Sequence, residues 1–297
     1  MRTSFVVLNT NAGTMGPEEE SKIRRAFADG GSEVTVVLVP PEDVEKAVRD
    51  ALGRNPDVVF VGGGDGTLAT AARCLLGSET SLGVLPLGTR NHFARDLGIP
   101  LEIEAAVKSL LAGVLVEVDV GKLNGIPFIN NASIGVYPEA VASREWHQHR
   151  IGMSKAAAWI LAIVNVFWRY PMQVLRIQWE GRGTIARTPF VLISNNQYVI
   201  AAEGFGRRVS LREGELGAYY APRVGRFRFL WNATKALFGL LRTGPDLEKI
   251  VASRVTVETR KRKVDVAVDG EIRSVRPPLE FEVVPRILRV VVPRPAA

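Results

Sequence analysis

The chain has 297 residues, of which 46% are hydrophobic and 23% are charged, so it forms one large or two ordinary globular domains and is not an intrinsically disordered chain. Its 38 Lys and Arg residues exceed its 31 Asp and Glu residues, and the net charge of +7 favours an anionic partner such as phosphates, an anionic membrane or a nucleic acid. A single cysteine, Cys74, excludes an internal disulfide framework and is typical of a reducing cytosol.

The chain contains no apolar segment long enough to span a bilayer. The best candidate covers residues 156–168, but Asn165 interrupts it, and a spanning helix needs about 20 apolar residues. The first residues lead directly into a short apolar strand without a cleavage signature, so we expect no signal peptide. Together with the single cysteine, this predicts a cytoplasmic protein.

The N-terminal part of the chain alternates between strand and helix patterns. Each strand is a short apolar run, and each helix has apolar residues at helical spacing. This alternation predicts a doubly wound α/β domain with a mostly parallel sheet, which binds ligands beyond the carboxyl ends of its strands. The expected elements are, in chain order, strand 4–8, helix 17–29, strand 33–39, helix 41–52, strand 58–61, helix 68–76, strand 81–85, a helix containing Phe93 and Ala94, helix 102–111 and strand 114–120.

The strand at 58–61 ends in a glycine-rich turn at 62–67, with the sequence Gly-Gly-Gly-Asp-Gly-Thr. Glycine tolerates positive φ and lets a ligand approach the backbone without a Cβ in the way. The N–H groups at the start of the following helix favour an anion, so the turn predicts phosphate binding. A carboxylate such as Asp65 is compatible with phosphate if it acts through Mg²⁺ or accepts from a hydroxyl. A tight turn that merely needs glycine is the alternative, and the lysine of a Walker motif is missing.

The pattern changes after Asp119, and short strands with period-two alternation dominate the rest of the chain. In the segment 279–283, for example, Leu279, Phe281 and Val283 alternate with two glutamates. This alternation predicts an antiparallel β-sandwich or barrel with one face of each strand on the core. We therefore expect two domains, residues 1–120 and 121–297, which pack closely because no Ser- or Pro-rich linker separates them.

Two helical segments interrupt the second domain, at 151–169 and 227–242. The second has leucines on one side and basic residues on the other, which is typical of a helix that lies on an anionic lipid surface. An ordinary helix that covers the sheet with a solvated basic face is the alternative. From these segments we expect transient membrane docking through residues 146–170 or 223–243.

Four segments of the chain resemble one known family in their sequence and their order. The chain is similar to the diacylglycerol kinase catalytic-domain family, in its bacterial lipid kinase branch, and the match extends nearly from end to end. The glycine turn alone would also suit NAD kinases and phosphofructokinases. The segment 85–95 distinguishes the diacylglycerol kinase family from these two. The four segments are Asn9 to Gly13, Gly62-Gly63-Gly64-Asp65-Gly66-Thr67, Leu85-Pro86-Leu87-Gly88-Thr89-Arg90-Asn91-His92-Phe93-Ala94-Arg95 and Asp269-Gly270-Glu271.

The resemblance implies a two-domain lipid kinase that uses ATP and Mg²⁺, with the lipid entering between the domains. Glu271 would accept the proton of the lipid hydroxyl, with Asp269 beside it and Asp65 as the third catalytic residue. Without the upstream segments, Asp-Gly-Glu is a plain hairpin turn. The implied nucleotide-binding residues are Asn9, Gly62, Gly63, Gly64, Asp65, Gly66, Thr67, Thr89 and Asn91.

The resemblance also implies a Mg²⁺-binding loop of the form Asp-Gly-x-Leu, to which the stretch 210–216 corresponds. Glu213 replaces the aspartate, which weakens this site, and its other expected ligands include the main-chain oxygens of Ser210 and Glu215. The family also has an Asp network that reaches the active-site Mg²⁺ through water, and Asp65 and Asp119 match this network. His92 stands where many relatives carry Asp. A neutral histidine is a poor ligand for a hard cation, so His92 contacts phosphate or simply packs.

Two other histidines, His147 and His149, lie in a polar stretch without a cysteine or a paired acid at metal spacing, so we expect no zinc site there. A soluble NAD kinase-like enzyme is one rival, but the Asn-Glu pair of that family is missing. A non-catalytic nucleotide- or lipid-binding regulator is another, supported by Glu213 and His92. We expect no nucleic-acid binding, because aromatic residues do not interleave with the basic ones. The expected partners are a lipid alcohol and an anionic membrane, which the protein meets peripherally, and a homodimer is compatible with the sequence.

Overall fold

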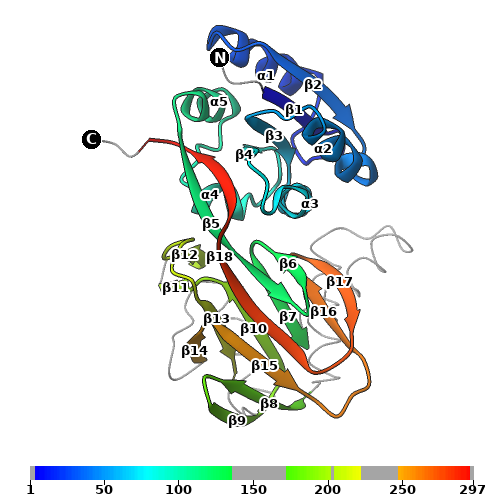
Figure 1. Ribbon diagram of the computed structural model, residues 1–297, viewed down its shortest axis with the longest axis vertical. Helices are drawn as coiled ribbons and strands as arrows, with labels where there is room; N and C mark the ends of the chain where they lie inside the picture. The colour runs from blue at the N-terminus through cyan, green and yellow to red at the C-terminus, as the bar shows by residue number, and fades with distance from the viewer. Residues whose placement is uncertain (1–3, 136–171, 202–203, 222–246, 295–297) are drawn as a thin grey trace. The chain divides into compact units, whose positions relative to one another are not determined.

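The structure is a computed structural model that describes residues 4–135, 172–201, 204–221 and 247–294 (Figure 1). The chain divides into two compact units. The first unit contains Met1–Val120, Ser210–Glu213 and Val284–Ala297, and the second contains Gly121–Val209 and Gly214–Val283. The end of the chain therefore belongs to the same unit as its beginning.

The first unit is built on a parallel sheet with the strand order β2-β1-β3-β4. Strand β1 (Ser4–Asn9) pairs in parallel with both β2 (Val34–Val39) and β3 (Val58–Gly63), and β3 pairs with β4 (Ser81–Pro86). The chain moves outward from β1 to β2 and then crosses back to β3, so the strand order reverses beside β1. Open α/β sheets bind ligands beyond the carboxyl ends of the strands at such a reversal. Asn9 and Gly63 end the two strands at this point.

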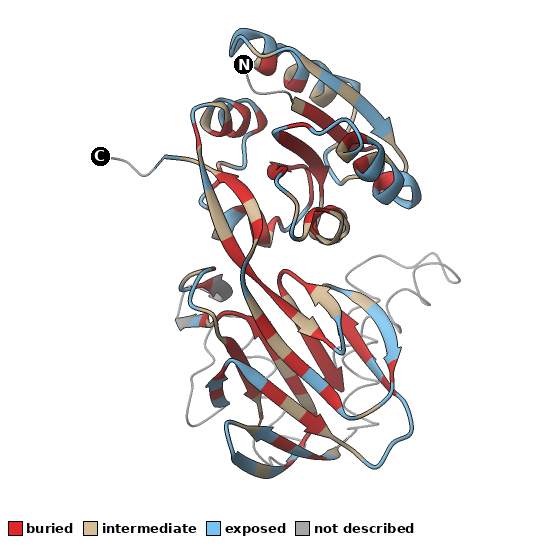
Figure 2. Ribbon diagram, viewed as in Figure 1, coloured by how far each residue is buried: buried red, intermediate tan, exposed pale blue. Residues whose placement is uncertain are grey.

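Helices cover the sheet of the first unit. Helix α1 (Pro17–Asp29) packs against α5 (Ile103–Leu111), and α2 (Val44–Leu52), which follows the short η1 (Pro41–Asp43), packs against α3 (Asp65–Leu75). Every residue of β3 and β4 is buried, as expected for apolar strands that are covered on both faces (Figure 2). A short helix, α4 (His92–Asp96), follows β4.

The second unit is an antiparallel β-sandwich. One sheet has the order β14-β13-β10-β7-β16-β17, and the other contains β15, β8 and β9 beside the first part of β18. Apolar side chains from both sheets, such as Ile177, Val266 and Phe281, form one core. The strands of this unit are β6 (Ile126–Phe128), β7 (Asn131–Gly135), β8 (Gln173–Trp179), β9 (Arg182–Thr188), β10 (Phe190–Asn195), β11 (Tyr198–Ala201), β12 (Gly204–Arg208), β13 (Leu216–Tyr220), β14 (Glu248–Ala252), β15 (Arg254–Glu258), β16 (Val264–Val268) and β17 (Glu271–Val275).

Two long strands, β5 (Val114–Leu123) and β18 (Leu279–Val292), contribute residues to both units. The first residues of β18 pair with β15 in the second unit, whereas Val290 pairs in parallel with Leu82 of β4 in the first (Figure 1). The predicted alternation at 279–283 covers only the start of β18. The rest of the strand was not predicted, and the adjacent Val290 and Val291 are both buried, which interrupts the period of two.

The predicted fold class is confirmed, with a mostly parallel α/β sheet followed by an antiparallel sandwich. One predicted boundary is wrong in a way that bears on function. Helix α3 begins at Asp65 and not at 68, so Asp65, Gly66 and Thr67 form the first helical turn.

The helices predicted at 151–169 and 227–242, and the two histidines His147 and His149, lie outside the described residues. Across the described residues, we find no helix with the length and apolar character that a bilayer-spanning segment requires.

Candidate functional site

The turn after β3 needs its glycines for close packing. None of the glycines at 62, 63, 64 and 66 has φ in the left-handed region, so the expectation of positive φ is wrong. A Cβ at Gly63 would instead lie 2.5 Å from the Cβ of Thr67, and a Cβ at Gly62 would lie 2.6 Å from the side chain of Leu8. The turn therefore lies so close to its neighbours that only glycine fits at these two positions.

The loop after β4 lies directly against this turn. A Cβ at Gly88 would lie 2.4 Å from the Cα of Gly64, so the two backbones are in contact. Asn91 shapes the loop: its φ is 52°, its Oδ1 accepts from the Gly88 N–H at 2.9 Å, and its Nδ2 donates to the carbonyls of Gly88 at 2.8 Å and Pro86 at 3.3 Å. Asparagine suits this position because it tolerates the left-handed conformation and bonds to nearby backbone.

Two side chains connect the loops that follow β1, β3 and β4. The Asp65 carboxylate accepts from the backbone N–H groups of His92 at 3.3 Å and Phe93 at 3.1 Å, where a negative charge suits the start of α4. Asn9 Nδ2 donates to Thr67 Oγ1 at 2.8 Å. The structure thus brings together residues that lie far apart in the sequence, at the sheet edge where the strand order reverses.

The start of α3 is open to an approaching ligand. Gly66 is exposed, and a Cβ at this position would meet nothing within 4 Å. Gly64 is the N-cap residue of this helix and provides no side-chain cap, so an anion can satisfy the N–H groups of the first turn. The exposed Thr89 lies nearby in the loop network, since a Cβ at Gly13 would be 3.0 Å from its Oγ1. An open helix start of this kind suits an anion such as phosphate.

The Asp-Gly-Glu turn lies in the second unit, between β16 and β17. Asp269 and Gly270 have φ values of 48° and 89°, as in the tight turns that join antiparallel strands, so the hairpin conformation is present. The Asp269 N–H donates to the Asn131 carbonyl at 2.9 Å, which ties the turn to the start of β7. The turn therefore also contacts a part of the chain outside its own hairpin.

The partly buried Asp269 carboxylate bonds to three consecutive N–H groups. Oδ2 accepts from Ile129 at 2.8 Å, and Oδ1 accepts from Asn130 at 2.8 Å and Asn131 at 3.1 Å. Burial raises the pKa of Asp269 to about 6, while these N–H groups and the charge of Arg208 oppose the rise. These contacts hold the turn in place and leave Glu271 as the more accessible carboxylate of the pair.

Glu271 begins β17 and is partly exposed. Its Oε2 accepts from Arg273 Nη2 at 2.7 Å, on the same face of the strand. Glu271 is therefore a partly exposed carboxylate on a fixed turn, paired with one arginine.

One expected metal ligand, Asp119, is bonded to the loop that contains Ser210 and Glu213. Asp119 is 1% exposed, its Oδ1 accepts from the Arg286 N–H at 2.9 Å, and its own N–H donates to the Leu211 carbonyl at 2.8 Å. Ser210 and Glu213 belong to the first unit, as Asp119 does, and Ser210 Oγ accepts from the Arg212 N–H at 3.1 Å.

Glu215 belongs to the second unit, where its carboxylate accepts from Gln197. Among the residues that the structure describes, no group of three or more His, Cys, Asp or Glu side chains could hold a metal. A nucleotide-bound Mg²⁺ needs only one or two protein carboxylates besides phosphates and water. The Asp65 carboxylate has lone pairs beyond its two N–H bonds, so it fits this need.

Several polar residues around the Asp-Gly-Glu turn escaped the sequence analysis. The pair Asn130-Asn131 between two apolar strands was the one signal available, since adjacent amides are unusual there. Arg208 gave none, because it follows another arginine and resembles a surface residue. The structure shows that Arg208 is buried and that it bonds to Ile129, Asn195 and Asn130.

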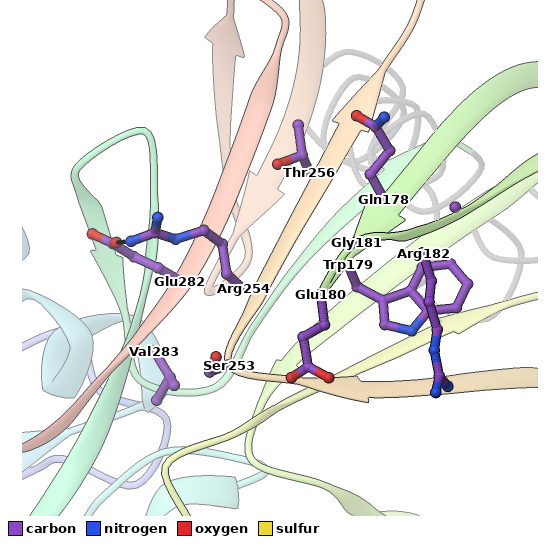
Figure 3. A pocket seen from close by; sticks show the side chains of 11 residues that line it. Gln178, Trp179, Glu180, Gly181, Arg182, Ser253, Arg254, Thr256, Glu282 and Val283 are labelled. Carbon is purple, nitrogen blue, oxygen red and sulfur yellow. Dashed lines mark hydrogen bonds and ion pairs between the residues drawn. The ribbon is translucent and has the colours of Figure 1, made fainter.

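A recess of about 660 Å³ lies elsewhere in the second unit, at the β8–β9 turn and the neighbouring ends of β15 and β18 (Figure 3). Trp179, Glu180 and Arg182 line it, together with Arg254 and Glu282, which form an ion pair at 3.1 Å. It contains none of the predicted site residues. Its paired charges are those of a solvated sheet face.

Comparison with known proteins agrees with the resemblance in the sequence. The diacylglycerol kinase catalytic domain family matches residues 3–123, and the YegS C-terminal NAD kinase beta sandwich-like domain family matches residues 132–292. A diacylglycerol kinase from Bacillus subtilis (strain 168) is 27% identical over 302 residues, which cover 100% of this chain and 98% of that protein. A protein from Pseudomonas aeruginosa named probable lipid kinase YegS-like is 38% identical over 141 residues, 46% of each chain.

Solved structures with a similar fold are also diacylglycerol kinases. A solved diacylglycerol kinase structure from Bacillus anthracis str. Sterne superposes with a TM-score of 0.74 at 21% identity, over 99% of this chain and 97% of that one. The second family alone matches more than half of the chain, and the first matches the part that contains the glycine turn. The chain therefore belongs to the diacylglycerol kinase and YegS-like lipid kinase family, with a diacylglycerol kinase catalytic domain followed by a YegS C-terminal domain.

Proposed function

We propose that this protein transfers the γ-phosphate of ATP to the hydroxyl group of a membrane lipid such as diacylglycerol. The observation that carries the proposal is the junction of three loops in the first unit. Asp65 binds the start of α4, Asn9 binds Thr67, and Gly66 leaves the start of α3 open. Such a junction at the reversal of a parallel sheet suits a triphosphate.

The first unit acts by binding and by neutralising charge. Phosphoryl transfer needs in-line positioning and stabilisation of the negative charge that spreads over the transferred group. The first N–H groups of α3, with Thr67 and Thr89, bind the phosphates, and Asn9 fixes the hydroxyl of Thr67. Asp65 is the residue that would hold a nucleotide-bound Mg²⁺, which supplies charge neutralisation when present, and Asp119 is the second candidate.

The second unit supplies the base. The proton of the lipid hydroxyl must leave as its oxygen bonds to phosphorus, and we propose that Glu271 takes it. Arg273 orients the Glu271 carboxylate, and Asp269 holds the turn. In this proposal the nucleotide-binding role belongs to residues 1–120 and the base to residues 121–297. Ser210, Glu213 and Glu215 are proposed to form a separate, weak Mg²⁺ loop.

The lipid must come from a membrane, so we propose that the protein docks transiently on an anionic bilayer from the cytoplasm. The supporting observation is the net charge of +7. Each basic residue near an anionic surface contributes about 1 kcal/mol. Sedimentation with vesicles that contain or lack phosphatidylglycerol tests this part separately, since binding to the anionic vesicles alone is expected.

A labelled-ATP assay against a total lipid extract tests the reaction itself. The wild-type protein should produce a labelled lipid in the presence of Mg²⁺ and none after chelation. The Asp65→Ala and Glu271→Ala variants should lose the product, while Arg254→Ala, which alters an exposed pair in the second unit, should keep it. Label in a soluble nucleotide such as NADP instead of a lipid would overturn the proposal, and so would full activity in both acid variants.

A further inference from the structure

The second unit contains a buried arginine that the proposed mechanism does not use. Arg208, the last residue of β12, is 5% exposed. Its Nη1 donates to the Ile129 carbonyl and, at 3.3 Å, to the Asn195 carbonyl, and its Nη2 donates to Asn130 Oδ1 at 3.1 Å. Burying a cation is costly unless acceptors and an opposite charge compensate it. These three oxygens are acceptors for Arg208, and the opposite charge is that of Asp269.

Arg208 and Asp269 bind the same segment, residues 129–131, from two sides. The Asp269 carboxylate takes the N–H groups of all three residues, and the guanidinium takes the Ile129 carbonyl and the Asn130 side chain. The two charges attract each other across this segment, and the charge of Arg208 favours the ionised form of Asp269. The segment is therefore clamped between the buried Arg208 and the partly buried Asp269.

Further hydrogen bonds fix the segment to neighbouring strands. The Asn195 N–H donates to the Asn130 carbonyl at 3.0 Å, and Asn131 Nδ2 donates to the Tyr198 hydroxyl at 2.9 Å. The Tyr198 N–H in turn donates to the hydroxyl of the fully buried Tyr219 at 2.9 Å. These bonds connect the segment to β10, β11 and β13, so its position is determined by the core of the sandwich.

The same segment holds the turn that precedes Glu271. The Asp269 N–H and both of its carboxylate oxygens bond to residues 129–131, which makes four hydrogen bonds between turn and segment. Glu271 begins β17 two residues after Asp269. Any shift of the segment therefore moves the backbone that carries Glu271.

We propose that Arg208 is a positioning residue for phosphoryl transfer, which clamps residues 129–131 against Asp269 and thereby fixes the turn from which Glu271 reaches the lipid hydroxyl. The inference rests on the proposed role of Glu271 as the base. A residue that only stabilised the fold would change the fraction of folded protein. A positioning residue instead lowers kcat of the folded protein, and it leaves the KM for ATP unchanged because ATP binds to the loops of the first unit.

Arg208→Lys tests the proposal in the full-length protein with diacylglycerol in mixed micelles. Lysine keeps the charge but loses the planar fork that reaches several acceptors at once. We expect kcat to fall about 10- to 100-fold, since misplacement by 1 Å costs this much, and the KM for ATP to change by less than about twofold. Arg254→Lys is the matched control, because Arg254 is 72% exposed in the same unit and should keep full kcat. Titration with ATP counts the folded molecules, so that kcat refers to these alone.

A double variant separates this inference from the proposed function. If Arg208 acts through Glu271, Arg208→Lys should have no further effect on kcat in a Glu271→Gln background, because the base is already missing. Unchanged kcat in Arg208→Lys, together with an inactive Glu271→Gln, overturns the inference and leaves the proposed base in place. Full activity of Glu271→Gln overturns both. A raised KM for ATP at unchanged kcat, or additive losses in the double variant, also overturns the inference.

Discussion

The glycine loops of the first unit and the Asp-Gly-Glu turn of the second unit are held in different ways. In the first unit, residues of the sequence motifs contact one another: Asp65 binds the N–H groups of His92 and Phe93, and Gly88 lies against Gly64. In the second unit, Asp269 binds residues that lie 138 to 140 positions earlier in the chain. When the residues of sequence motifs contact one another, the motifs together identify the site in the sequence. A turn that is held by distant residues looks like an ordinary hairpin in the sequence.

The largest expected effect tests whether these two regions have separate tasks. Glu271→Gln keeps the shape of the side chain but removes the base, so kcat should fall about 10²- to 10⁴-fold. The affinity for ATP should stay the same, because the loops that bind it are in the first unit. Steady-state kinetics and calorimetric titration with an ATP analogue measure the two quantities. Loss of nucleotide binding along with activity would contradict the separation.

The first region could be predicted from the sequence better than the second for a physical reason. Glycines at 62, 63 and 88 are needed because a Cβ would clash, and such a requirement shows directly as a residue type. Of the two reasons given for glycine, positive φ does not apply at these positions, and Asn91 is the residue of these loops that has it. The position was therefore predictable although its cause was not.

The parts that could not be predicted depend on contacts between distant segments. Nothing in the local sequence distinguishes the buried Arg208 from the exposed Arg212. Similarly, Val290 of β18 adds to the N-terminal sheet beside Leu82, a pairing that periodicity within either strand cannot indicate. Both depend on tertiary structure, which pattern and propensity do not encode.

The next effect is the pH dependence of stability that Asp269 causes in the second region. The pKa of Asp269 rises from 3.8 to about 6 on folding, so the folded protein binds this proton more tightly than the unfolded chain. The stabilising contribution is therefore complete below about pH 4 and is lost as pH rises through about 6, by about 3 kcal/mol for a shift of about two units.

Asp269→Asn removes the titrating group and with it this part of the pH dependence. Urea unfolding of both proteins between pH 4 and pH 8 gives the difference in free energy of unfolding at each pH. As the pH rises from about 4 to about 6, the free energy of unfolding of the Asn variant should increase relative to that of the wild type. A difference that does not change with pH would show that the carboxyl titrates alike in both states.

Within the first region, two glycines allow a finer comparison. Gly88→Ala forces a Cβ against the Gly64 backbone and should lower the free energy of unfolding by about 1–3 kcal/mol. Gly66→Ala has open space and lies in a helix, so it should raise stability by about 0.5–1 kcal/mol while its methyl group obstructs the phosphates. Thermal unfolding measures the change in stability, and ATP titration measures the change in ATP affinity. Equal ATP affinity in Gly66→Ala and the wild type would mean that phosphates do not approach at this position.

The smallest expected effect comes from the exposed counterpart of Arg208. Arg254 Nη2 lies 3.1 Å from Glu282 Oε2, but the two side chains are 72% and 42% exposed, so water screens the pair. Arg254→Gln should change the free energy of unfolding by less than about 1 kcal/mol, and added salt should reduce this difference further. Urea unfolding at low and high salt measures both. Arg208 differs from Arg254 in its burial and in bonding to several acceptors at once. If Arg254→Gln lowered the free energy of unfolding as much as Arg208→Gln does, the clamp around residues 129–131 would contribute no more than an ordinary surface ion pair.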